Sequence, residues 1–218
     1  MSRFTVNEKE GYSPQYSLED YLEYRKILAD CSSQERSDVI FNDSYVHAAL
    51  VLTSILEYMM KQETKEISMY CGKFALFRDS AKNAITNLRA MVKPADDDTL
   101  KMEKWRDFDP YETMLAKFDE FMKEGGTMRV IIENDISDIK SEYVWEKLEK
   151  HIKSERLCFW RLTVPLRLNH FIVAGKSYRQ ENDDLEKTAI CCFNDDITCK
   201  ALKKRYQILE LMSETYKF

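Results

Sequence analysis

The sequence predicts an α/β fold, a mixed sheet flanked by helices on both faces, with an N-terminal helical extension. Of 218 residues, 44% are hydrophobic, and only five Gly and four Pro occur, so the chain can fill one core and is not of low complexity. From about residue 66 onward, apolar runs typical of strands alternate with apolar residues at helical spacing. Before residue 66 only helical spacing is found, which predicts two parts, residues 1–65 and 66–218.

The first part is expected to hold a loose arm and two helices. Residues 1–16 mix Gly, Pro, Ser and charge without a period, as is typical of an arm. Ser17 is placed to cap a first helix, and Asp20 completes a capping box. A second helix with one apolar face is predicted from Asp43 or Ser44 through Lys61.

The second part opens with a strand over 67–72 that Gly72 ends, followed by helical spacing over 74–91. Residues 93–109 carry a Pro, three consecutive Asp and no clear period, which predicts a surface connection. Asp109 then caps a helix with Pro110 in its first turn, and the Gly pair at 125–126 ends it.

Two buried strands frame the next helix. The nearly continuous apolar run over 128–134 predicts a strand covered on both faces, and the run over 156–164 predicts another. Between them, Ser137 or Ser141 is expected to start a helix that reaches about Lys153.

The last third predicts a hairpin, a strand and a closing helix. The pattern predicts two strands, over 170–173 and 177–181, joined by a turn at 174–176. It predicts one more strand over 187–195. Asp195 or Asp196 caps the final helix. We expect the segments near 67, 130, 159, 171 and 190 to form one unbroken sheet whose polar ends gather in a shared cleft.

Charge and composition narrow the function classes. The net charge of −5 leaves no chain-wide cationic field for nucleic acid or an acidic membrane, and residues 197–218, with five basic and two acidic groups, hold the only basic concentration. No apolar run is long enough to span a bilayer and no signal peptide is evident, so we expect a cytoplasmic protein without membrane contact. No Cys or His spacing indicates a zinc site, and no glycine-rich nucleotide loop occurs; no metal and no cofactor are expected.

The segments HFIVAGKSYRQE and AICCFND, together with the order of elements over about 66–216, resemble a single half-unit of the phospholipase-D-like superfamily. The resemblance implies that His170 takes the position of the family's nucleophile. The family's Lys two residues later is Ile172 here, and the Ser before the family's Asn is Phe193. These departures predict a degenerate active site.

The candidate site residues follow from this resemblance and from strand alternation. His170 is catalytic only if the protein is active; beside an apolar strand, a lone His is more often a structural side chain. Arg179 and Glu181 point to one face of their strand, where an Arg and a Glu commonly form structural ion pairs with neighbouring side chains. With Lys176 and Asn194 they make up the predicted binding residues.

Three functions remain open. The first is an intracellular, non-catalytic phospholipase-D-like interaction module, a subunit of a larger bacterial assembly that could be associated with antiviral defence. The second is a phosphodiesterase or nuclease whose site is shared across a homodimer, with His170 from each chain. The third is a nucleic-acid-binding protein that uses the basic C-terminal helix. A protein partner or homo-oligomer is expected, and nucleic acid is less well supported.

Overall fold

The computed structural model describes residues 16–93, 99–164, 166, 168–183 and 188–218. At its centre is a mixed eight-stranded sheet in the order β1-β7-β6-β5-β2-β3-β4-β8. Strands β2, β3 and β4 are parallel, and every other pairing is antiparallel. The six longer strands are β2 (Glu66–Cys71), β3 (Thr127–Ile132), β4 (Leu157–Leu162), β5 (Phe171–Ala174), β6 (Ser177–Asp183) and β7 (Thr188–Cys192). The predicted segments near 67, 130, 159, 171 and 190 thus lie in one sheet.

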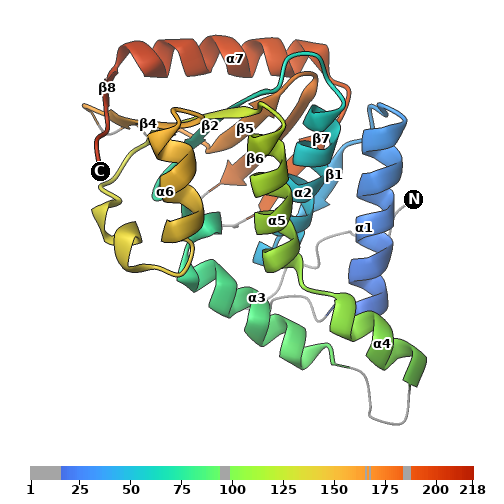
Figure 1. Ribbon diagram of the computed structural model, residues 1–218. Helices are drawn as coiled ribbons and strands as arrows, with labels where there is room; N and C mark the ends of the chain where they lie inside the picture. The colour runs from blue at the N-terminus through green and yellow to red at the C-terminus, as the bar shows by residue number, and fades with distance from the viewer. Residues whose placement is uncertain (1–15, 94–98, 165, 167, 184–187) are drawn as a thin grey trace.

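Helices cover both faces of this sheet (Figure 1). One face packs on α7 (Asp196–Leu211), and the other on helices that include α2 (Tyr45–Met60), α5 (Pro110–Lys123) and α6 (Trp145–Lys153). Because side chains alternate along a strand, Met69 of β2 joins the core under α2 and α5, and Tyr70 joins the core under α7. The predicted α/β class, with helices on both faces, is confirmed.

Four helices begin at polar N-cap residues that the sequence predicted. Ser17 forms a capping box with Asp20 at the start of α1 (Leu18–Ser33), and the Ser44 side chain accepts from the His47 amide at the start of α2. Asp109 caps α5 in the same way, and Asp195 caps α7. These side chains satisfy amides that have no partner within the helix.

The region expected as a surface connection contains a helix, α4 (Thr99–Asp107). None of its residues is buried, so no apolar period marks it in the sequence. A tertiary contact holds it, because the Trp105 indole donates to the Arg89 carbonyl at 3.3 Å near the end of α3 (Asp79–Met91). The described part of the connection is exposed, as expected of a surface segment, but it contains a helix that the sequence did not predict.

Two predicted helices are each divided in the structure. The 3-10 turns η1 (Ala75–Phe77) and η2 (Ser137–Ser141) precede α3 and α6. The Arg78 side chain between η1 and α3 is buried, and it binds Asp138 at 2.8 Å and Glu142 at 2.7 Å. This ion-paired joint lets the chain change direction before each helix.

Two strands of three residues were not predicted, β1 (Ile40–Asn42) and β8 (Ser213–Thr215), because they are too short to show a pattern. β1 pairs with β7 in the central sheet, and α2 packs in the main core. Residues 40–60 therefore share the sheet and the main core with later parts of the chain, and the division at residue 65 stays a prediction. The predicted arm lies outside the described residues, apart from Tyr16.

Candidate functional site

His170 lies at the end of the sheet where the parallel strands β2, β3 and β4 have their carboxyl ends. The register pairs Tyr70 of β2 with Phe171 of β5, and Phe171 with Gln180 of β6. His170, just before β5, is therefore level with Glu181 of β6 and with the last residues of β2. The carboxyl edge of parallel strands is where open α/β sheets usually bind ligands.

Two carboxylates hold the His170 imidazole from opposite sides. Its Nδ1 is 2.9 Å from a Glu181 oxygen, and its Nε2 is 3.5 Å from a Glu133 oxygen. The Tyr70 hydroxyl donates to the other Glu133 oxygen, and the Tyr70 ring meets the imidazole edge-on at 5.5 Å between centroids. We call these four residues together with Arg179 the His170 cluster.

Arg179 connects the cluster to the first strand. Its guanidinium donates to Glu181 at 3.2 Å and to the Asn42 side-chain oxygen of β1 at 3.3 Å. Only 14% of the Arg179 side chain is exposed, so its charge is compensated within the protein. The network thus runs across β5, β6 and β1, through residues far apart in the sequence.

Gly72 makes room for the imidazole. A Cβ at this position would lie 3.3 Å from His170 Cε1, closer than most van der Waals contacts. The Gly72 carbonyl also accepts from the Asn134 amide at 3.1 Å, which holds the chain after β2 against the chain after β3. The glycine is therefore needed for a close approach to His170.

The cluster favours its charged form. Burial by itself would lower the pKa of His170, but the hydrogen bond and charge of Glu181, aided by Glu133, raise that pKa above its ordinary value. Burial by itself would raise the pKa of Glu181, but His170 and Arg179 hold it at about 2. The two shifts thus favour the charged pair of a His170 imidazolium and a Glu181 carboxylate.

This arrangement is poorly suited to nucleophilic attack. A nucleophilic His needs a free lone pair on one ring nitrogen, and here both nitrogens face carboxylates. Burial also raises the pKa of the neighbouring Cys71 thiol to about 12, so no thiolate forms beside His170 at neutral pH.

The structure brings together only some of the residues predicted for the site. His170, Arg179 and Glu181 meet, but Lys176 lies in the hairpin turn at the opposite sheet edge, where its carbonyl accepts from the Asp195 amide at 3.0 Å. Asn194 lies there too, and its carbonyl accepts from the Ser37 hydroxyl at 2.9 Å. The expectation that Asn194 shares a cleft with His170 is wrong, because β7 runs antiparallel to β6 and ends at the other edge.

Three members or neighbours of the cluster were missed from sequence: Glu133, Tyr70 and Asn42. Glu133 follows directly after β3, and polar residues at the carboxyl end of a parallel strand are site candidates. That signal could have identified it. Tyr70 and Asn42 carry no such signal, because their roles depend on how β1 and β2 are placed in the sheet.

Within the described residues, no group of three or more His, Cys, Asp or Glu side chains is placed to hold a metal ion. None of the described helices combines the length and the apolar character needed to span a bilayer.

No protein-family model matches the chain, and no curated protein matches it. The solved structures that are similar to the chain include three at 11%, 9% and 9% identity: TrmBL2, an archaeal chromatin protein; Nuc, a phospholipase D family member from Salmonella typhimurium; and polyphosphate kinase from Porphyromonas gingivalis. Their TM-scores are 0.48, 0.44 and 0.46, with 91%, 84% and 85% of this chain covered. The chain spans 64% of the first, 99% of the second and 27% of the third. Likenesses at this level carry no argument about activity.

Proposed function

We propose that the chain is a non-catalytic interaction module of phospholipase-D-like type and a subunit of a larger assembly. The observation that carries the non-catalytic part is the position of His170, whose two ring nitrogens both face glutamate oxygens. The half-unit, the cytoplasmic location and the defence association stay predictions from the sequence.

Electrostatics supports a structural role for the His170 cluster. A phosphodiester carries negative charge, and at this edge it would approach Glu133 and Glu181 before reaching the imidazole. The charge of Arg179 is already bound to Glu181 and Asn42. Ile172, at the family's Lys position, is buried in the core and supplies no charge. The cluster therefore serves to join β5, β6 and β2.

The outer face of α7 supports the interaction part of the proposal. Ile197, Ile208 and Leu211 are 84%, 52% and 88% exposed and follow one side of this helix at heptad spacing. We call these three residues the α7 stripe. The exposed cation Lys204 lies in this row, between Ile197 and Ile208, and the exposed cations Lys203 and Arg205 lie beside it.

An apolar row edged by positive charge fits an amphipathic helix with acidic flanks. We therefore assign the α7 stripe to a helix of this kind in a protein partner.

The catalytic alternatives are tested by cleavage assays. Wild type, His170→Ala and Glu133→Gln would be incubated with a chromogenic phosphodiester and with single-stranded DNA and RNA. We expect no turnover by wild type above the His170→Ala background. Turnover that His170→Ala abolishes would overturn the non-catalytic assignment, and a dimer in light scattering would then support the site shared across a homodimer.

The partner surface is tested by copurification from the host followed by cross-link mapping. An Ile208→Ser, Leu211→Ser double variant should lose a partner that wild type retains in stoichiometric amount, while the exposed control Gln207→Ala on the same helix retains it. The cross-links must place an acidic helix of that partner on α7. Equal retention by all three proteins, or cross-links to another surface, would reject this role of the α7 stripe.

A further inference from the structure

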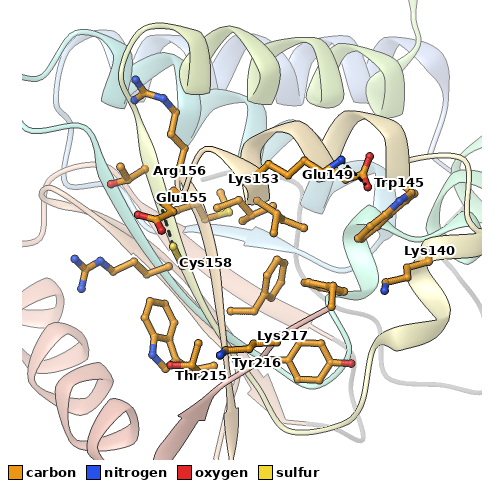
Figure 2. A pocket seen from close by; sticks show the side chains of 18 residues that line it. Lys140, Trp145, Glu149, Lys153, Glu155, Arg156, Cys158, Thr215, Tyr216 and Lys217 are labelled. Atoms are coloured by element: carbon orange, nitrogen blue, oxygen red, sulfur yellow. Dashed lines mark hydrogen bonds and ion pairs between the residues drawn. The ribbon is translucent and has the colours of Figure 1, made fainter.

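A concave site lies away from the His170 cluster, on the side of the sheet formed by β4 and β8. It has a volume of about 690 Å³ and is lined by α6, β4 and the residues that follow Ser213 (Figure 2). That volume lies within the range of roughly 300–1,000 Å³ typical of small-molecule sites. We call it the β4 cavity.

Aromatic rings form much of its wall. Phe218 contacts Trp145, Phe159 and Tyr216, with centroid distances of 5.2, 5.2 and 5.1 Å. Phe159 is buried beneath the others, whereas Trp145 and Tyr216 are half-buried and keep part of their surface toward the cavity. Trp160 also lines it. Half-buried aromatic rings of this kind can pack against a planar ring of a ligand.

Positive charge surrounds the rings, although the chain as a whole is acidic. Five basic side chains and two acidic ones line the cavity. Lys153 is paired with Glu149 at 3.1 Å, and Arg129 lies 3.6 Å from Glu210. Three further cations, Lys140, Arg156 and Lys217, form no ion pair within the described residues.

The positions of two of these cations suit an anionic ligand. Lys140 reaches over the Trp145 ring, with its Nζ 5.8 Å from the ring centroid, and Lys217 follows Tyr216 directly in the chain. Figure 2 shows Lys140 beside Trp145 on one side of the cavity, and the Lys217 side chain on another side, extending away from the Tyr216 ring. Lys140 therefore stands next to an aromatic ring, and Lys217 adds a second positive charge to the lining of the cavity.

A ligand that satisfies this site needs a planar ring and a negative charge in one small molecule. We propose that the β4 cavity binds a nucleotide, with the base against the aromatic rings and the phosphate near Lys140 and Lys217. The nucleotide can be free or part of a single strand of nucleic acid. This site is separate from the α7 stripe and does not depend on the proposed interaction with a partner helix.

Tryptophan fluorescence offers a direct readout, since two of the three Trp residues line the cavity. The probes are AMP, ATP, inorganic phosphate and a ten-residue oligothymidylate, with calorimetry as the second measurement. We expect AMP or ATP, or the oligonucleotide, to quench the emission and bind more tightly than inorganic phosphate. Preference for the mononucleotides or for the oligonucleotide identifies the source of the ligand.

The decisive comparison is between two double variants that remove the same charge. Lys140→Ala with Lys217→Ala should weaken binding at least about tenfold, because two cation–phosphate contacts are lost. Lys203→Ala with Lys204→Ala on α7 should leave binding within about twofold, because those cations lie outside the cavity. Absence of binding by every nucleotide probe, or an equal or greater loss in the α7 variant, would overturn the proposal; a loss confined to the α7 variant would instead support nucleic-acid binding by the basic helix.

Discussion

Replacement of Glu181 by Gln removes one charge from the His170 cluster with little change in shape. The pKa of Glu181 lies at about 2 instead of 4.5, a depression of about 2.5 units. At about 1.36 kcal/mol per unit this corresponds to at most about 3.4 kcal/mol of stability. Because 34% of the side chain faces water, screening reduces the expected loss to about 1.5 kcal/mol.

The pH dependence of this loss has a definite sign. A depressed carboxyl pKa stabilises the fold above about pH 4.5 and loses this effect as the pH falls toward about 2. The raised pKa of His170 stabilises the fold below about pH 6.5 and loses this effect as the pH rises through the folded value. The difference between wild type and Glu181→Gln should therefore be largest between about pH 4.5 and 6.5 and decline on both sides.

Urea unfolding at about pH 3, 5.5 and 9 measures the difference, and an NMR titration of His170 should show its pKa falling in the variant. The matched control is Glu66→Gln, at the other end of β2, where the carboxylate is 3.9 Å from Arg129 and both side chains are about half exposed. The control should change stability by less than about 0.5 kcal/mol. A Glu181→Gln difference that is independent of pH, together with an unchanged His170 pKa, would refute the reasoning.

Three further substitutions test how the fold supports this site. Gly72→Ala places a Cβ 3.3 Å from His170 Cε1 and should lower the free energy of urea unfolding by about 1–2 kcal/mol. The substitution should also shift the NMR signals of His170, and unchanged signals would contradict the close approach. Asp195→Ala removes the cap that accepts from the Thr198 amide at 2.9 Å and should cost about 1 kcal/mol, whereas Asp196→Ala, whose side chain pairs with Lys200 on the surface, should cost less. Arg78→Ala leaves the half-buried Glu142 without its cation and should lower the free energy of unfolding by about 3 kcal/mol. Arg78→Lys should recover only part of this loss. An unfolding midpoint of Arg78→Ala equal to that of wild type would show that the turn before α3 does not depend on this ion pair.

Local patterns in the sequence were sufficient to predict the longer strands, most of the helices and several helix caps. Capping residues such as Ser17 and Asp195 accept from amides two or three positions away, so a cap can be recognised from residues that are close together in the sequence. The strand predicted over 128–134 was recognisable because residues 130–132 are buried on both faces, which makes this stretch apolar without alternation. In contrast, α4 and the strands β1 and β8 are held by contacts with distant residues, and their own sequences show no pattern that predicts them.

The sequence by itself determined the α/β class, the order of the main strands and helices along the chain, and the placement of Arg179 and Glu181 on one strand face. These properties depend on spacing along the chain, which local sterics and burial set. Only the tertiary structure decided which strand ends share an edge. That edge brings Glu133 to His170 and leaves Asn194 at the opposite edge, because the direction of each strand in the sheet follows from pairings between segments more than sixty residues apart as well as from neighbouring turns.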